Sequence, residues 1–192
     1  YGEAENFNAG QAISQQSAKE GTLIHETVEA ILLGQKPVIE SAVEPAIRAF
    51  LEFLDTRNIQ VTPELVEKRV ASHDHRYAGT VDALALIDGK FGVLDIKTSQ
   101  AIYRDYNLQT AAYAEALKNN FQNLQTRWIL RIDQVQLCNL CGAIKRTKGG
   151  REKIKIQWDN QIMKNCPHEW SELRGDIELQ EFPYWQNDFE AF

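Results

Sequence analysis

Residues 92–100, GVLDIKTSQ, place the carboxylate of Asp95 and the ammonium of Lys97 two residues apart in an otherwise apolar run. The preceding Asp88-Gly89 is a strong signal for a two-residue hairpin turn between two strands. In that register Asp82 falls directly opposite Asp95, with Cβ atoms roughly 4.5–5.5 Å apart. Side chains alternate along a strand, so Lys97 shares this face. The pattern therefore predicts one patch that contains two carboxylates and an ammonium.

Two opposed carboxylates repel each other and destabilise a sheet. A divalent cation removes that repulsion, because Mg²⁺ and Mn²⁺ take oxygen ligands, often one or two carboxylates together with water and phosphate. Such an ion can activate water and stabilise phosphoryl charge, and Lys97 could orient that water or neutralise the transition state. The alternative is a solvated face on an ordinary hairpin. A turn of three or five residues would also break the register.

A helix is expected over residues 17–33, with His25 and Glu29 one turn apart on the same face. Gly21, one turn earlier, lets another backbone or a ligand come close. His25 could supply a nitrogen ligand to the metal, and Glu29 a further acid. The alternative is that His25 is a packed or solvated helix residue.

Gln109 and Tyr113 are likewise one turn apart in a helix expected over Tyr106 to Lys118. Gln109 could hydrogen-bond a phosphate, a water or Lys97, and Tyr113 could donate its hydroxyl to a phosphate or stack on a base. The alternative is that Tyr113 packs its ring into the core.

Four segments, in this order, carry a resemblance to a known family: GTLIHETVE, GTVDALALIDGK, FGVLDIKTS and YNLQTAAYAEAL. Together they resemble the PD-(D/E)xK nuclease superfamily, in particular its RecB-like branch, which includes phage exonucleases. The resemblance spans about residues 17–132. It implies an α/β fold with a restriction-endonuclease-like core, in which a mixed β-sheet of four or more strands is flanked by helices.

The resemblance also implies roles for individual residues. Asp82 and Asp95 match the metal carboxylates of the family, and Lys97 matches its catalytic lysine. His25 matches the additional metal ligand of the RecB-like branch. The other implied positions are the metal-facing carbonyl of Ile96, the downstream motif residues Gln109 and Tyr113, and Glu67, where relatives often carry an acid.

The C-terminal part contains a Cys-x-x-Cys-Gly segment that resembles a zinc knuckle, and a second Cys-x-His segment could complete a structural zinc site. Its ligands would be Cys138, Cys141, Cys166 and His168. The alternative is three ordinary reduced cysteines. No cysteine precedes the nuclease motifs, which disfavours the four-cysteine iron–sulfur cluster of some RecB-like nucleases.

A basic run surrounds Gly149-Gly150 and predicts a hairpin that could contact a DNA backbone. Its cationic residues are Lys145, Arg146, Lys148, Arg151, Lys153 and Lys155. The alternative is a solvated hairpin, which is the more common fate of such a run.

The length of 192 residues and a hydrophobic fraction of 43% predict one domain over residues 1–192. We expect a nuclease core over 17–132 and a C-terminal extension over 133–192. The remaining elements are expected to be a helix at 41–57 and strands at 61–72, 78–87, 90–97 and 126–132.

The chain contains no run of 18 apolar residues, so no membrane association is expected. Residues 1–10 lack the basic and apolar regions of a signal peptide, and the odd number of cysteines does not suit a disulfide framework. These features predict a cytoplasmic protein. The net charge of −6 argues against a surface coated with phosphate-binding lysines, but not against a local basic track.

These features favour a Mg²⁺- or Mn²⁺-dependent deoxyribonuclease, and specifically an exonuclease in DNA repair, recombination or phage DNA processing. Its partner would be DNA, and a helicase or recombinase could act with it. The alternative is a non-catalytic nucleic-acid-binding module on a nuclease scaffold. A small-molecule phosphohydrolase lacks support, because the sequence has no glycine-rich phosphate loop.

Overall fold

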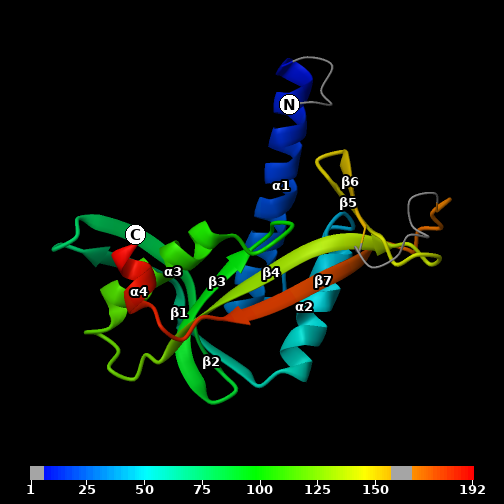
Figure 1. Cartoon of the computed structure of the whole chain (residues 1–192). Helices are drawn as coiled ribbons and strands as arrows, with labels where there is room; N and C mark the ends of the chain where they lie inside the picture. The colour runs from blue at the N-terminus through cyan, green and yellow to red at the C-terminus, as the bar shows by residue number, and fades with distance from the viewer. Residues whose placement is uncertain (1–6, 157–165) are drawn as a thin grey trace.

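The structure is a computed structural model that describes residues 7–156 and 166–192, with side chains from Gly10 onward. It is an α/β fold in which helices flank an open, mixed sheet (Figure 1). Within the described residues the helices are α1 (Phe7–Leu32), α2 (Glu44–Thr56), α3 (Arg104–Leu117) and α4 (Gln186–Glu190). The strands are β1 (Ile59–Ser72), β2 (Tyr77–Ile87), β3 (Lys90–Lys97), β4 (Thr126–Leu137), β5 (Ile144–Lys148), β6 (Arg151–Lys155) and β7 (Arg174–Glu181).

The sheet follows the order β1-β2-β3-β4-β5-β6, and β7 pairs with β4 beside this path. The β3–β4 pair is parallel, because α3 carries the chain back to the start of the sheet, and the other pairs are antiparallel. β4 pairs with β3 through its first half and with β7 along most of its length. It is therefore the central strand that joins the expected nuclease core to the C-terminal part.

Two apolar cores lie on opposite faces of the sheet. On one face, α1 and α2 pack Val28 and Phe50 against strand residues such as Leu94. On the other face, α3 packs against strand residues that include Val93. Neighbouring residues of β3 thus enter different cores, as alternation along a strand requires. Asp95 and Lys97 have the same parity as Val93, which places them on the α3 side.

The two hairpin turns have the backbone conformation that their sequences predict. Asp88 and Gly89 both have positive φ angles, of 50° and 83°, as a type I′ turn requires. Gly149 and Gly150 have φ angles of 61° and 79° and join β5 to β6. The expected β2–β3 hairpin and the expected basic hairpin are both confirmed.

Four elements differ from the expectation, of which α4, near the C-terminal end, was not anticipated. α1 begins at Phe7, ten residues before the expected start at residue 17. β4 continues to Leu137, beyond the expected end at residue 132. β7 was not anticipated, because only two apolar residues, Ile177 and Leu179, occur in the otherwise mostly polar run RGDIELQE. It forms because its backbone pairs with β4 and α2 packs beside it.

A buried arginine fixes α3 against the sheet. Arg127, at the start of β4, is fully buried and its guanidinium bonds to Asn107 and to Thr110 Oγ1 of α3, the latter at 3.0 Å. It also forms an ion pair with Asp188 of α4. A single cation thereby ties two helices to the central strand. No helix among the described residues is both long and apolar enough to cross a membrane.

Candidate metal centre

Asp82 and Asp95 lie where the β2–β3 ladder opens. The ladder keeps the predicted register from Ile87–Lys90 to Ala83–Leu94. The next two positions are Asp82 and Asp95, and here a side chain replaces the backbone pairing. Asp82 Oδ2 accepts a hydrogen bond of 2.6 Å from the backbone N–H of Ile96. The structure thus brings the two carboxylates to the same point of the hairpin.

Asp95 is a buried carboxylate with incomplete hydrogen bonding. It is 1% exposed, and its Oδ2 atom has no hydrogen-bond partner among the described residues. Lys97 Nζ lies 2.7 Å from this oxygen and forms an ion pair with it, although the directional geometry of a hydrogen bond is not met. Burial raises the pKa of Asp95 from 3.8 to about 6, against the opposing effect of the Lys97 charge. An arrangement this costly is typical of functional sites.

α1 brings His25 to the carboxylates. His25 Nε2 lies 3.3 Å from Asp82 Oδ2. The hydrogen bond and the charge of Asp82 raise the pKa of His25, although burial acts in the opposite direction. The packing of Ile24 and Val28 into the core beneath α1 holds the helix in this position.

A second acidic pair adjoins His25. One potential ligand atom from each of His25, Glu29 and Glu67 lies within 4.8 Å of the other two. Glu67 occupies the β1 position opposite Asp82, and its φ angle of 51° interrupts the β1–β2 ladder there. Strained backbone of this kind is concentrated at functional sites. Burial raises the pKa of Glu67, as do the neighbouring charges of Glu29 and Asp82.

These donors fit a hard divalent cation. Neighbouring ligands at about 2.1 Å from an octahedral ion lie about 3.0 Å apart, which is close to the 3.3 Å between His25 Nε2 and Asp82 Oδ2. The carboxylates of Asp82, Asp95, Glu29 and Glu67 supply the oxygen donors that Mg²⁺ and Mn²⁺ prefer. The compact group contains His25, Glu29 and Glu67, and neither Asp82 nor Asp95 belongs to it. Asp82 contacts His25 alone in that group, and Asp95 Oδ2 forms an ion pair with Lys97.

α3 contributes aromatic and amide side chains to the same face. Lys97 Nζ lies 5.1 Å from the ring centroid of Tyr106, a contact that the sequence did not predict. Gln109 Nε2 donates a 2.8 Å hydrogen bond to the hydroxyl of Tyr113. Tyr113 is 8% exposed and packs in the core on the α3 side, and its ring lies over Gly79, where a Cβ would come within 2.7 Å of it. Gln109 is thus bonded to Tyr113, and the Tyr113 ring packs in the core, which is the alternative stated for it.

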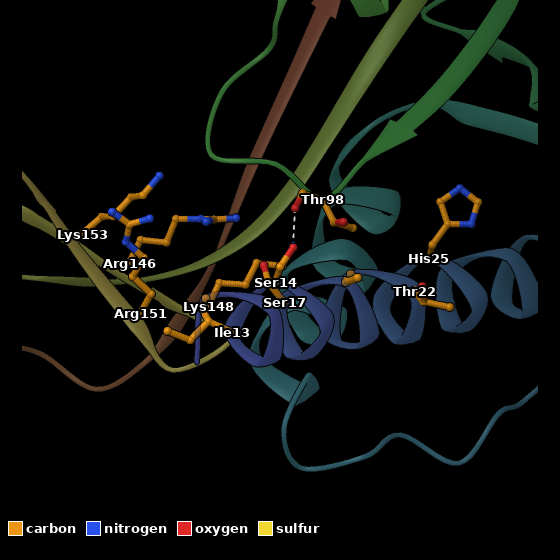
Figure 2. Close-up of a pocket in the computed structure, with 13 residues that line it drawn as sticks. Ile13, Ser14, Ser17, Thr22, His25, Thr98, Arg146, Lys148, Arg151 and Lys153 are labelled. Carbon is orange, nitrogen blue, oxygen red and sulfur yellow. Dashed lines mark hydrogen bonds between the residues drawn. The ribbon is translucent and has the colours of Figure 1, made fainter. Parts of the chain in front are cut away.

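A cationic cleft of about 660 Å³ leads away from His25. It runs between α1 and the β5–β6 hairpin, and Figure 2 shows His25 and the cationic side chains toward opposite ends, with Thr98 between them. The cationic residues that line it are Arg146, Lys148, Arg151 and Lys153.

The hairpin cations are not equivalent. Lys148 is buried and donates to the carbonyl of Thr98, and Arg146 donates to Asp133. Lys145 is not among the cleft residues, because it lies 3.7 Å from Glu152 and 4.9 Å from the ring of Trp170. Lys153 reaches Gln100 Oε1 at 3.1 Å from an exposed position.

Two glycines allow α1 to approach the rest of the cleft. A Cβ at Gly21 would lie 2.7 Å from Thr98 Oγ1, just beyond the end of β3. A Cβ at Gly149 would lie 2.4 Å from the carbonyl oxygen of Ile13, so the tip of the hairpin rests on the α1 backbone. Gly21 thus allows a close approach, which is made by the Thr98 side chain and not by the backbone or ligand that the sequence predicts.

The remaining predicted residues form a separate group. The ligand atoms of Cys138, Cys141, Cys166 and His168 lie within 4.8 Å of one another, near the start of β5.

No family model matches the sequence, and no curated protein matches it.

Proposed function

We propose that this protein is a divalent-metal-dependent deoxyribonuclease with a restriction-endonuclease-like core, and that it acts as an exonuclease in DNA repair, recombination or phage DNA processing. The observation that carries the proposal is the buried carboxylate of Asp95. Its Oδ2 forms an ion pair with the Lys97 ammonium but has no hydrogen-bond partner among the described residues, and the Asp82–His25 contact lies nearby. Burial of a carboxylate whose Oδ2 accepts no hydrogen bond is costly even beside an ammonium, and a bound cation would complete its environment.

The metal would be held by His25, Asp82, Asp95 and the carbonyl of Ile96. Glu29 and Glu67 lie close enough to His25 to hold further coordinated water or a second ion. When bound, the ion would activate a water for attack on the phosphodiester and stabilise the charge on the phosphate. Asp82 keeps its position because the Ile96 backbone N–H donates to it.

Lys97 is the cation that would stabilise the developing negative charge. Its side chain is 20% exposed, so it reaches the surface while Asp95 beneath it stays buried. Tyr106 packs against the ammonium and limits its movement. An ammonium held in place before the reaction needs no reorganisation when charge develops on the phosphate.

The cleft supplies a path for a nucleic-acid strand. Its position beside α1 and its cations suit a phosphate backbone. Gln109 and Tyr113 would position the strand near the scissile phosphate from the opposite side. Such backbone contacts give affinity without sequence preference, which suits an exonuclease.

The deciding experiment is digestion of end-labelled linear DNA and of covalently closed circular DNA, with and without Mn²⁺. We expect wild-type protein to degrade linear DNA only with the ion, to spare circular DNA, and to lose cleavage in Asp82→Asn. Cleavage of the circular DNA would show that the protein is an endonuclease, because closed circular DNA has no end for an exonuclease to attack.

Gel shifts in Ca²⁺ measure binding separately from cleavage. DNA binding without cleavage under any divalent ion would instead establish a non-catalytic nucleic-acid-binding module. A protein that neither binds nor cleaves DNA would reject both functions. A helicase or recombinase that acts with the enzyme would increase the rate or the length of digestion when added to the same assay.

A further inference from the structure

Three cysteines and one histidine converge at the base of the basic hairpin. Cys138 directly follows the last residue of β4, and Cys141 lies in the short turn before β5. Cys166 and His168 come from the segment that leads to β7. One ligand atom from each of the four lies within 4.8 Å of the others, and the cysteines are free thiols.

The distances match a single tetrahedral ion. Sulfur atoms bound to zinc at 2.3 Å with tetrahedral angles lie about 3.8 Å apart, and a sulfur and a nitrogen about 3.6 Å apart. The Sγ atoms of Cys138 and Cys166 are 3.8 Å apart. Cys141 Sγ and His168 Nδ1 are 3.4 Å apart. A disulfide would require about 2.05 Å between two sulfurs, and an iron–sulfur cluster would hold the cysteines further apart around its inorganic sulfides.

The surrounding backbone holds the ligands in this geometry. The loop between the first two cysteines is closed by backbone hydrogen bonds: the Cys138 N–H donates to the Ala143 carbonyl at 2.8 Å, and the Gly142 N–H donates to the Cys138 carbonyl at 2.9 Å. Gly142 turns the chain with a φ angle of 71°. The backbone N–H of Asn139 donates to the Glu169 carbonyl at 2.8 Å. The two ligand segments are thus joined by backbone hydrogen bonds as well as by the four side chains.

We propose that Cys138, Cys141, Cys166 and His168 bind one Zn²⁺ ion, and that this ion fixes the angle of the β5–β6 hairpin over the cleft. On binding, the thiols lose their protons to solvent and His168 coordinates through Nδ1 with its other nitrogen protonated. All four positions are filled by protein, so the site is structural and performs no chemistry.

The link to the hairpin is short and direct. Only Gly142 and Ala143 separate Cys141 from β5. The His168 ring stacks on the Trp170 ring, with 4.7 Å between their centroids. Lys145 Nζ of β5 lies over the same Trp170 ring, 4.9 Å from its centroid. A metal that holds Cys141 and His168 together therefore holds β5 from its first residue and from its side.

The first test is metal content, which is independent of any enzymatic activity. We expect purified full-length protein to contain about one zinc per chain, and cobalt substitution to give the visible bands of a tetrahedral thiolate site. Cys141→Ser should lose the metal, whereas Cys141→His should retain it with a weaker thiolate-to-cobalt charge-transfer band. Asp82→Asn is the matched control at the other candidate centre and should keep its zinc.

A second measurement uses only wild-type protein, so it does not depend on whether a variant folds. A thiol reagent should react slowly with the three cysteines until a chelator is added, and modification should release about one zinc for every three thiols. Protein that binds neither zinc nor cobalt, with thiols as reactive as those of unfolded chain, would overturn the proposal. Oxidation of Cys138 and Cys166 to a disulfide without bound metal would also overturn it.

The effect on the hairpin is tested by hydrogen exchange and by DNA binding, and its second part rests on the proposed function. Removal of zinc should speed amide exchange in residues 144–155 at least tenfold more than in β2 and β3. It should also weaken DNA binding in Ca²⁺ about tenfold while Mn²⁺ still binds near Asp82. Zinc binding with protected hairpin amides but no DNA binding would reject the nuclease and retain the zinc site. Unchanged exchange on zinc removal would overturn the link to the hairpin.

Discussion

Lys97 and Asp95 have different roles at the proposed site, although they form an ion pair with each other. Asp95 is buried and available as an oxygen ligand, whereas an ammonium cannot bind a cation. A change at Lys97 should therefore affect the reaction and leave metal binding in place.

We expect Lys97→Ala to slow DNA cleavage on the order of 10²–10³-fold, because it removes a preorganised electrostatic contact to the phosphate. Mn²⁺ binding measured by calorimetry should persist. Lys90→Ala is the matched control on the same strand, since Lys90 pairs with Glu181 at the surface, 2.8 Å away, and it should cut DNA at the wild-type rate. Wild-type cleavage by Lys97→Ala would remove Lys97 from the mechanism.

Asp95 gives a prediction about stability and pH. Its folded-state pKa is raised to about 6, so the ionised group opposes folding, and stability falls as pH rises from about 4 through 6. Asp95→Asn carries no charge at any pH. The metal-free variant should therefore be more stable than metal-free wild type by about 1–3 kcal/mol at pH 8, with little difference at pH 4.

Chemical denaturation of both proteins with a chelator present measures this difference. Addition of Mn²⁺ should raise the unfolding free energy of wild type and leave Asp95→Asn nearly unchanged. A metal-free variant that is less stable than wild type at pH 8 would show that Asp95 has a structural role instead.

At the scale of elements, the cleft depends on how closely the basic hairpin approaches α1. The two turn glycines, Gly149 and Gly150, both have positive φ. They differ in surroundings, because a Cβ at Gly149 would meet the Ile13 carbonyl oxygen at 2.4 Å, whereas a Cβ at Gly150 would meet nothing within 4 Å.

Alanine at either glycine should destabilise the turn by about 1–2 kcal/mol, the cost of a left-handed backbone for a residue with a Cβ. Gly149→Ala should also push the hairpin away from α1, so its DNA affinity should fall well below that of Gly150→Ala. Gel shifts in Ca²⁺ and thermal denaturation separate the two effects. Equal DNA affinity of the two variants would mean that the hairpin position does not control binding.

At the scale of the whole molecule, an acidic protein carries a cationic cleft. The net charge is −6, yet four cations line the surface between α1 and the hairpin. Long-range repulsion of DNA by the remaining surface would then be screened by salt, while local contacts displace counterions from the strand.

We expect DNA affinity in Ca²⁺ to fall steeply with salt concentration, and Lys153→Ala to lower the slope of the logarithmic plot by about one. Lys155→Ala is the matched control, because it is an exposed lysine two residues along the same strand that does not line the cleft. An equal change of slope in both variants would indicate a diffuse charge effect and no specific path.

Much of the site follows from the sequence, because local rules determine it. The Asp88-Gly89 turn sets the register of one hairpin, and that register alone brings Asp82 to Asp95. The helical period places His25 and Glu29 on one face in the same way. The Cys-x-x-Cys-Gly segment likewise predicts half of a metal site from a few consecutive residues. In each case the interacting groups are separated by one turn of helix or one hairpin, so propensity and periodicity are sufficient.

Only the tertiary structure decided which distant segments meet. Glu67 joins His25 because β1 bends opposite Asp82 and α1 packs across that point, and neither event has a local signal. β7 forms because its backbone pairs with β4, far away in the sequence. The basic hairpin borders the cleft because Gly149 lets its tip rest on the α1 backbone. These contacts depend on the packing of the whole chain, in which the burial of apolar faces outweighs weak local preferences, and residue types alone therefore did not predict them.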